Sequence, residues 1–419
     1  MNKAKFYESE FETIVTEMLE KEGWTYTHGQ DLHRKETEAI YEEDLRKFLD
    51  RRYVDECLNE YDMDKAVAKM KHATGESTYR AMANIVKLAR EGFDFKSSNP
   101  GAKPFRMEYI DFVHPERNVF RVVNQFTYYE GSKNYRPDIL LFVNGIPLVI
   151  FELKNPANPH ATVKKAHQQI TNRYWFNMPS LMKYIPLSVV SDNAKTLFGT
   201  TTSALEYFYA WKKVENNDEP AKDGGACLKS LIKGALSPTR LLEIYRDYLY
   251  FPDPAKGEEN ELSVVCRYPQ FFAARKLRDS VLANLRSRGG NGKGGLYFGA
   301  TGCGKTFTML FLARLLSQRC RDKLGSPTIL LIVDREDLES QAGRLFCNSK
   351  DYLGDNAVEV FDSRKALGAE MRTRKSGGFY ITTIQKFTEA TGLLSDRSNI
   401  ICMSDEAHRT QNNTGSKLK

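Results

Sequence analysis

The spacing of apolar residues changes along the chain and predicts two regions of α/β structure. Apolar side chains recur at helical spacing in residues 6–22, and further helical tracts are expected at about 37–61, 64–90 and 162–175. In residues 105–154 the apolar positions instead alternate or run together between turn signals, which predicts β-strands. The first half of the chain is therefore expected to hold a sheet flanked by helices.

After a polar stretch at 251–261, short apolar runs alternate with helical or loop sequence. Such runs are typical of a parallel sheet whose two faces are both covered. Five of them are expected to form strands: LYFGA (296–300), TILLIVD (328–334), VEVF (358–361), FYITTI (379–384) and IICMS (400–404). The sequence thus predicts a mixed-sheet domain at 1–250, a linker at 251–262 and a parallel-sheet domain at 263–419.

The composition excludes several classes of protein. A hydrophobic fraction of 41% across 419 residues is too high for a largely disordered chain. No apolar run approaches the ~20 residues that cross a bilayer, and the N-terminus turns acidic too early for a signal peptide. The 7 cysteines form no CxxC pair, which argues against a disulfide framework or a zinc ribbon. We therefore expect a soluble cytoplasmic protein without membrane or lipid partners, and its net charge of +7 mildly favours polyanions.

Residues 299–306, GATGCGKT, match the eight-position phosphate-binding pattern and lie between an apolar run and a helical segment. The glycines let backbone N–H groups wrap a phosphate, and the helix N-terminus adds its dipole. Lys305 would reach the terminal phosphates of ATP, and the Thr306 hydroxyl would ligate Mg²⁺. The candidate nucleotide-binding residues of this loop are Gly299, Thr301, Gly302, Cys303, Gly304, Lys305 and Thr306.

Asp405 and Glu406 begin the tetrapeptide DEAH, directly after the apolar run IICMS. An aspartate at the end of a strand can hold Mg²⁺ through water, and the neighbouring glutamate can polarise the attacking water. Together with the phosphate-binding loop, this pair predicts a site that binds and hydrolyses ATP.

A second pair of acids lies at the ends of two predicted strands. Pro137-Asp138 opens the run DILLFV, and Glu152-Leu153-Lys154 closes the run IPLVIFELK. Two carboxylates at one point can hold Mg²⁺, which activates water and offsets the charge that develops on a phosphodiester. Lys154, two residues beyond Glu152, lies on the same strand face and could orient the nucleophile. The arrangement matches the PD-x(n)-ExK signature and resembles the nuclease superfamily named after it.

The turn between these two strands decides whether the carboxylates meet. Asn144-Gly145 is a strong hairpin signal. A two-residue turn there would place Asp138 opposite Phe151, whereas a three-residue loop would place it opposite Glu152. Because the metal chemistry requires the two acids to meet, we expect the three-residue loop.

Two accessory features resemble those of related nucleases. Glu8 or Glu12, on the first predicted helix, could add a metal ligand, although a solvated helix face is expected for each taken singly. Gln169 resembles the start of a Q-x3-Y motif that follows the core in several such nucleases. Here Tyr174 comes one position late and Arg173 occupies the expected place, so the role of this segment stays open.

Four segments of the second region resemble motifs I, Ia, Ib and II of superfamily 2 helicases and translocases: GATGCGKT, VDREDLESQ (333–341), ITTIQKF (381–387) and DEAHR. The resemblance implies a RecA-like motor domain that uses ATP, with Arg335, Thr383 and Gln385 touching the nucleic-acid backbone. It also suggests Gln270 as the glutamine that reads adenine through its carboxamide, although a solvated glutamine is an open alternative.

A PD-ExK nuclease followed on one chain by a superfamily 2 motor resembles the restriction subunit of type I restriction-modification enzymes. The resemblance implies Mg²⁺-dependent cleavage of double-stranded DNA, ATP-driven translocation, and a complex with methyltransferase and specificity subunits. Such motors need a second RecA-like domain, which does not follow residue 419, so an N-terminal fragment or a truncated gene product is expected. Two alternatives stay open: a stand-alone nuclease–helicase of DNA repair or phage defence, and a catalytically inactive DNA-binding assembly module.

Overall fold

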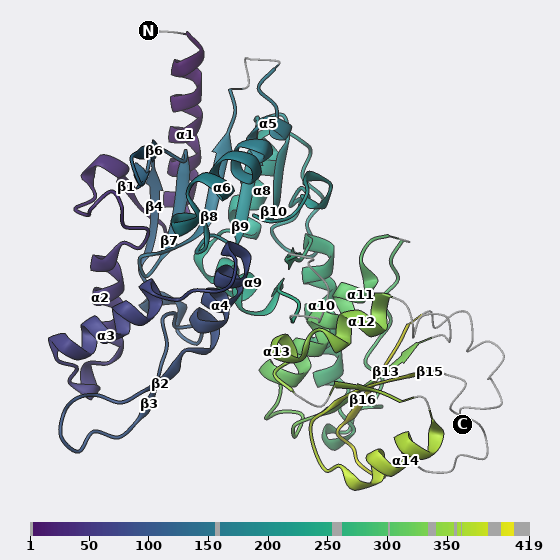
Figure 1. Cartoon of the computed structure of the whole chain (residues 1–419). Coiled ribbons are helices and arrows are strands. Elements are labelled where there is room, and N and C mark those ends of the chain that lie inside the picture. The colour runs from purple at the N-terminus through teal and green to yellow at the C-terminus, as the bar shows by residue number, and fades with distance from the viewer. Residues whose placement is uncertain are drawn as a thin grey trace. The chain divides into compact units, whose positions relative to one another are not determined.

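Two compact units make up the chain. The computed structural model describes residues 3–155, 160–253, 262–300, 302–333, 341–355, 358–361, 363–383 and 395–405. Contacts between residues group Met1–Leu249 with Glu261–Arg267 in unit 1, and Tyr250–Asn260 with Tyr268–Lys419 in unit 2. Each unit has its own sheet and its own covering helices (Figure 1).

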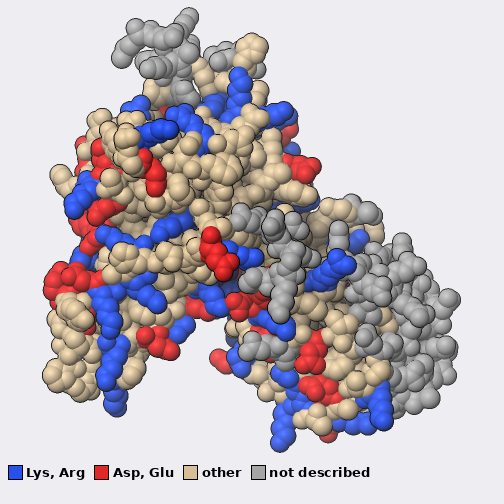
Figure 2. All heavy atoms as spheres, in the orientation of Figure 1, with Lys and Arg blue, Asp and Glu red and all other residues tan. Residues whose placement is uncertain are grey.

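The surface carries both signs of charge. Figure 2 shows Lys and Arg side chains interspersed with Asp and Glu over the face in view, so the net charge of +7 is not gathered into one patch there. Among the described residues, no helix is both long and apolar enough to cross a membrane.

Unit 1 is built on a six-stranded mixed sheet with the strand order β1-β4-β7-β8-β9-β10. β1 runs parallel to β4 and β8 runs parallel to β9, while the other neighbours are antiparallel. The carboxyl ends of β1, β4, β8 and β9 therefore meet the start of β7 at one edge of the sheet. The strands are β1 (Thr25–His28), β4 (Phe120–Asn124), β7 (Ile139–Val143), β8 (Ile146–Leu153), β9 (Leu187–Ser191) and β10 (Thr196–Thr200).

Every residue of β7 and β8 is buried, which makes this pair the centre of the sheet. These two strands confirm the expectation for the runs DILLFV and IPLVIFEL. Strands β1, β9 and β10 were not expected, because each is short and none shows a long alternating pattern. Helices α1 (Lys3–Lys21) and α5 (Val163–Gln168) both contact β8, and Figure 1 shows them near the same end of the sheet.

The remaining elements of unit 1 are short. Its other helices are α2 (Glu42–Arg52), α3 (Glu60–Lys71), α4 (Thr78–Glu91), a π-helix (Gln169–Tyr174), α6 (Trp175–Asn177), α7 (Pro179–Met182), α8 (Gly225–Gly234) and α9 (Pro238–Asp247). Its minor strands are β2 (Phe93–Phe95), β3 (Phe105–Met107), β5 (Tyr128–Glu130), β6 (Lys133–Tyr135) and β12 (Val264–Val265), and β11 (Leu249–Tyr250) lies where the units divide.

The two long helical tracts predicted at 37–61 and 64–90 are wrong in their bounds. Three shorter helices, α2, α3 and α4, occupy this region. Capping residues cause the breaks: the Asn59 side chain accepts a hydrogen bond from the Asp62 N–H, and the Ser77 hydroxyl accepts one from the Arg80 N–H. Each cap satisfies a free donor at a helix start and so separates one helix from the next.

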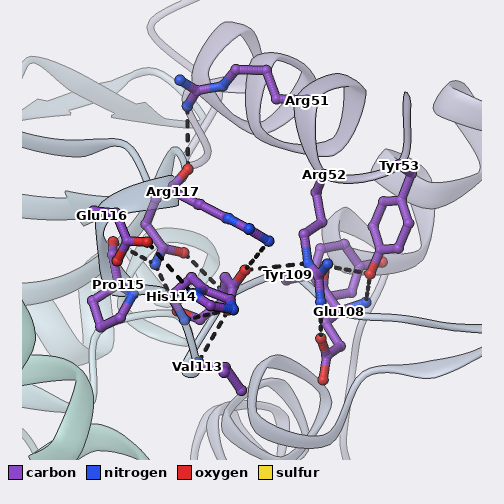
Figure 3. Close-up of polar contacts among 12 residues, drawn as sticks. Arg51, Arg52, Tyr53, Glu108, Tyr109, Val113, His114, Pro115, Glu116 and Arg117 are labelled. Carbon is purple, nitrogen blue, oxygen red and sulfur yellow. Dashed lines mark hydrogen bonds and ion pairs between the residues drawn. The ribbon is translucent and has the colours of Figure 1, made fainter. Parts of the chain in front are cut away.

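A buried carboxylate fastens the loop that leads into β4 to the end of α2. Asp111 is 1% exposed, and its Oδ1 accepts the N–H groups of Val113 and His114 at 3.0 and 2.8 Å. Its Oδ2 lies 3.5 Å from Arg52 Nε and 3.8 Å from Arg117 Nη1. Figure 3 shows both arginines converging on this loop. These contacts join the loop that precedes β4 to the end of α2.

Unit 2 contains a four-stranded parallel sheet with the order β14-β15-β13-β16. Its strands are β13 (Thr328–Val333), β14 (Val358–Val360), β15 (Phe379–Thr383) and β16 (Ile400–Ser404), which confirms four of the five predicted strands. Its helices are α10 (Tyr268–Ala283), α11 (Lys305–Arg314), which continues as a π-helix (Leu315–Arg319), α12 (Gln341–Cys347), α13 (Lys350–Leu353) and α14 (Arg364–Thr373).

The strand predicted at 296–300 is wrong. Residues 293–300 carry no strand, and Leu296 and Phe298 are 82% and 92% exposed. A strand needs a hydrogen-bonded neighbour, and among the described strands β16 pairs only with β13. The segment and β16 line the same cavity of about 830 Å³ without forming a ladder. The apolar pattern alone was therefore not sufficient to predict a strand here.

Candidate active sites

The turn between β7 and β8 has two residues, so the predicted three-residue loop is wrong. Val143 pairs with Ile146, which leaves only Asn144 and Gly145 in the turn. Both have positive φ, 49° and 75°, as a type I′ turn requires. On its own, this turn would have placed Asp138 opposite Phe151.

A β-bulge corrects the register farther along the same pair of strands. Phe142 pairs with Pro147, but Leu141 pairs with Val149, so Leu148 is the extra residue. The register that follows pairs Ile139 with Phe151, and its continuation brings residue 138 opposite residue 152. The pairing that the metal chemistry requires is therefore reached by a bulge rather than by a longer loop.

Asp138 and Glu152 lie at the edge where β7 starts and β8 ends, and both are buried. Their side chains belong to residues that are 9% and 0% exposed. Asp138 Oδ2 accepts the N–H of Leu153 at 2.6 Å, and Lys154 Nζ lies 2.5 Å from Glu152 Oε1. Two buried carboxylates thus lie at one point of the sheet, and one of them contacts an ammonium group.

This donor set fits a hard divalent cation. Mg²⁺ is commonly bound through one or two carboxylates while it keeps several waters. A cation would also offset the cost of burying two carboxylates beside a single lysine. Among the described residues, no group of three or more His, Cys, Asp or Glu side chains is placed to hold a metal. The pair Asp138 and Glu152 supplies two carboxylates at one point, the number with which proteins commonly bind Mg²⁺.

Gln169 and Tyr174 join the same cluster, because the helix that carries them is a π-helix. In a π-helix the hydrogen bond closes from i to i+5, so residue 174 stands over residue 169 as residue 173 would in an α-helix. Gln169 Nε2 donates to the Tyr174 hydroxyl at 2.8 Å, and Lys154 Nζ donates to Gln169 Oε1 at 3.1 Å. The late tyrosine therefore still meets the glutamine.

Tyr174 is buried against the acidic pair. Burial raises the pKa of Tyr174 well above its ordinary value, and the charges of Glu152 and Asp138 raise this pKa further. The hydroxyl group consequently stays protonated at neutral pH. It can support Gln169 without adding another negative charge beside the carboxylates.

Glu12 does not lie on a solvated helix face, contrary to the expectation. It is 4% exposed, because the side of α1 that carries it packs toward the sheet. Both of its carboxylate oxygens lie 2.7 Å from Gln125 Nε2. Gln125 has a left-handed backbone (φ 54°), and its N–H donates to the carbonyl of Asp138 at 2.9 Å. The side chain of Glu8 lies outside the described residues.

Sequence reasoning missed Gln125 for a physical reason. A left-handed residue is usually signalled by Gly or Asn, and glutamine carries no such signal. The nearest sequence hint is Gly29, where a Cβ would lie 2.4 Å from the Gln125 carbonyl oxygen. Close approach of the two backbones thus explains why residue 29 is glycine.

The phosphate-binding loop of unit 2 leads directly into α11. Gly304 is the residue before this helix and has a φ of 79°, a conformation that suits glycine. Lys305 begins α11, and its Nζ lies 3.4 Å from the carbonyl oxygen of Gly299. Gly299, Lys305 and Asp405 all line the cavity of about 830 Å³. Thr301 lies outside the described residues, while Gly302, Cys303 and Thr306 complete the loop around these groups.

Gln270 is buried against this loop, so the solvated alternative is wrong. It is 3% exposed, and its Nε2 donates to the carbonyl oxygens of Gly304 and Cys303 at 3.0 and 3.4 Å. A Cβ at residue 304 would lie 2.4 Å from this nitrogen. The backbone angle at 304 therefore favours glycine, and a Cβ there would also displace the amide of Gln270 from the loop.

The acidic partner of the loop is placed at the end of β16. Asp405 follows this strand directly, and its N–H donates to the carbonyl of Ile332 at 2.9 Å. Glu406, Arg335 and Gln385 lie outside the described residues. Thr383 ends β15 and is 2% exposed, which argues against the predicted contact of its side chain with a nucleic-acid backbone.

Comparisons with known proteins agree with this two-part architecture. A family model described as the type I restriction enzyme R protein N terminus matches residues 5–207. The type I restriction enzyme HindI endonuclease subunit of Haemophilus influenzae is 31% identical over 98% of this chain and 40% of its own length. By sequence, the chain is therefore similar to the endonuclease subunits of type I restriction enzymes. A second model, described as SWI2/SNF2 ATPase, matches residues 269–418.

Other type I endonuclease subunits show the same similarity. A putative MjaIXP subunit of Methanocaldococcus jannaschii is 28% identical over 96% of this chain and 40% of its own length. The SauCOLORF180P subunit of Staphylococcus aureus is 25% identical over 72% of this chain and 31% of its own length. The chain thus spans 40% of the length of the first two curated relatives that it matches. An α/β nuclease fold and a RecA-like ATPase fold account for the two units.

Proposed function

We propose that this chain carries the nuclease and the first motor domain of a type I restriction subunit. The nuclease domain, residues 1–250, would cleave double-stranded DNA with Mg²⁺. The motor domain, residues 263–419, would bind ATP for DNA translocation, and residues 251–262 would form the linker between the two domains. The observation that carries the proposal is the bulge-corrected register, which sets Asp138 opposite Glu152 with Lys154 on the second carboxylate. Methyltransferase and specificity subunits are the proposed partners.

In the proposed nuclease site, the two carboxylates and the lysine have different roles. Mg²⁺, when held by Asp138 and Glu152, supplies an activated water and offsets charge on the phosphate. Lys154 is held between Glu152 Oε1 and Gln169 Oε1, so its ammonium group is oriented before substrate arrives. Because the site is buried, its electrostatic interactions are stronger than they would be in water.

In the motor site, Lys305 and the loop amides would hold the phosphates of ATP. Thr306 and Asp405 would hold Mg²⁺, and Glu406 would polarise the attacking water. Gln270 is proposed to contact the adenine of ATP. Its amide donates a hydrogen bond to the carbonyl of Gly304, so it would connect the adenine to the phosphate-binding loop. Lys305 and Asp405 border one cavity, which supports this assignment.

Removal of the metal tests the proposed nuclease directly. The full chain should nick supercoiled plasmid in the presence of Mg²⁺ and lose this activity in EDTA. Mg²⁺ alone, titrated by calorimetry, should bind the wild-type chain, and Glu152→Gln should remove the heat that arises from this site. Equal nicking with and without metal would refute the proposal. Copurification with a methyltransferase would distinguish a restriction complex from a stand-alone nuclease–helicase.

Gln169→Ala should lower the rate of cleavage by about 10- to 100-fold, the range seen when a group that orients a metal-site residue is removed. The substitution deletes the oxygen that accepts from Lys154 Nζ and the donor to Tyr174. The measurement is the single-turnover rate of plasmid nicking at saturating Mg²⁺. Tyr174→Phe is the matched control, because it removes one hydroxyl and leaves Gln169 to hold Lys154, so a smaller loss is expected. An unchanged rate for Gln169→Ala would show that Lys154 does not depend on this contact.

A further inference from the structure

Arg173 is an exposed cation anchored on a wall of buried aromatic rings. Its guanidinium carbon lies 5.8 Å from the centroid of the Tyr135 ring and 5.9 Å from that of Tyr174. The two tyrosine rings meet edge to face at 6.5 Å and are 7% and 2% exposed. Cation–π contacts of this kind hold a guanidinium in place while its N–H edges stay accessible. The charge is therefore fixed in position at the surface.

This cation lies beside the proposed nuclease centre. Tyr174 is joined through Gln169 to Lys154 by hydrogen bonds of 2.8 and 3.1 Å. Lys154 Nζ in turn lies 2.5 Å from Glu152 Oε1, and the guanidinium of Arg173 lies against the ring of Tyr174 at the other end of this chain of contacts. Arg173 thus belongs to the rim of the cluster that holds the two carboxylates.

The π-helix explains why an arginine stands there. In a regular α-helix, residue 173 would occupy the place above Gln169, and its side chain would point at Lys154. The extra residue of the π-turn gives that place to Tyr174 and turns Arg173 outward. One insertion therefore keeps the buried tyrosine and adds a surface cation next to it.

A second cation, Arg136, lies in the chain between Tyr135 of this wall and the carboxylate of Asp138. It follows Tyr135, precedes Pro137-Asp138, and is exposed. Within the described ranges of the chain, neither Arg136 nor Arg173 forms an ion pair with an acidic side chain. The two carboxylates of the site, Asp138 and Glu152, would repel the negative charge of a phosphodiester. Two unpaired cations at the rim would reverse that repulsion locally.

We propose that Arg173 and Arg136 bind DNA phosphates that flank the one to be cleaved. The inference rests on the proposed nuclease function and adds the residues that position its substrate. A guanidinium edge can donate two parallel hydrogen bonds to one phosphate, which fixes the strand as well as attracting it. Contacts of this kind position DNA without reading its sequence.

DNA binding without chemistry tests this inference. A blunt duplex of random sequence is titrated with the full chain in EDTA over a range of salt concentrations. Each phosphate contact contributes about −0.9 to the slope of log K against log salt. Arg173→Ala and Arg136→Ala should each make this slope shallower by about one, with a several-fold loss of affinity at low salt. Arg173→Lys should keep the wild-type slope because it keeps the charge. It should bind DNA more weakly than the wild type because an ammonium group cannot donate the two parallel hydrogen bonds of a planar guanidinium.

Lys47→Ala is the matched control. Lys47 is an exposed cation of α2 and borders a cavity with Phe120, the first residue of β4, at the sheet end opposite the carboxylates. Its removal changes the net charge equally and should leave the slope unchanged. If Arg173→Ala matches Lys47→Ala in slope and affinity, the inference is overturned, even where Asp138→Ala still abolishes cleavage. If Asp138→Ala leaves cleavage intact, the nuclease proposal fails instead, whatever the slopes. Equal melting temperatures of the variants establish that each is folded.

Discussion

Asp138→Ala is expected to abolish Mg²⁺-dependent DNA cleavage while leaving ATP binding unchanged. The substitution removes one of the two buried carboxylates that are proposed to hold the cation, and the remaining one, Glu152, contacts Lys154. The nucleotide-binding loop lies in the other unit and should not be affected. Plasmid nicking measures the first property, and equilibrium binding of a fluorescent ATP analogue measures the second.

Two further variants separate chemistry from folding. Asp138→Asn keeps the size of the side chain and an oxygen that can accept the Leu153 N–H, which Asp138 Oδ2 accepts at 2.6 Å. We expect it to melt like the wild type and to lack cleavage. Lys154→Ala should also lose cleavage, because it removes the ammonium group held between Glu152 and Gln169. Cleavage that survives in both Asp138→Ala and Lys154→Ala would refute the assignment of this site.

The β7–β8 hairpin shows what motif and spacing can predict and what they cannot. The chemistry of the motif required Asp138 to lie opposite Glu152, and the register of the strands agrees. Asn144-Gly145 signals the two-residue turn, but the bulge at Leu148 leaves no signature in residue type, so the way in which the register is reached was not predictable. A bulge is selected by packing on the two faces of a sheet, which a single sequence does not reveal.

The contact between Gln169 and Tyr174 depends on the type of helix that carries them. Counting residues on an α-helix put Arg173 above Gln169 and left Tyr174 out of place. The π-helix absorbs one residue and brings Tyr174 to Gln169. The sequence does not reveal this helix type. Residue spacing predicts which side chains face each other only when the number of residues per turn is known.

Burial by tertiary contact accounts for the other differences. Glu12 and Gln270 have polar side chains that composition alone would place in solvent, yet they are 4% and 3% exposed. Each is buried because a partner from a distant part of the chain meets it, Gln125 in one case and the carbonyl of Gly304 in the other. Conversely, Leu296 and Phe298 lie exposed because no described strand pairs with them.

Lys305→Ala is expected to weaken the binding of ATP–Mg²⁺ by about 10- to 100-fold, which corresponds to the loss of a charged hydrogen bond of about 1.5–3 kcal/mol. Lys305 begins α11 and borders the cavity that Asp405 also lines, so its ammonium group is placed to meet the terminal phosphates. The loop amides and Gly304 remain in the variant, and residual binding should therefore be measurable by calorimetry.

Lys323→Ala is the matched control for this experiment. Lys323 is an exposed cation that precedes the start of β13, at the end of the parallel sheet opposite Asp405. Its removal changes the net charge as Lys305→Ala does, but it should leave the affinity for ATP–Mg²⁺ unchanged. Cleavage of plasmid in the absence of ATP should be the same in both variants, because the carboxylates lie in unit 1. Wild-type affinity in Lys305→Ala would mean that the cavity beside β16 is not the nucleotide site, and the motor assignment would then lose its physical basis.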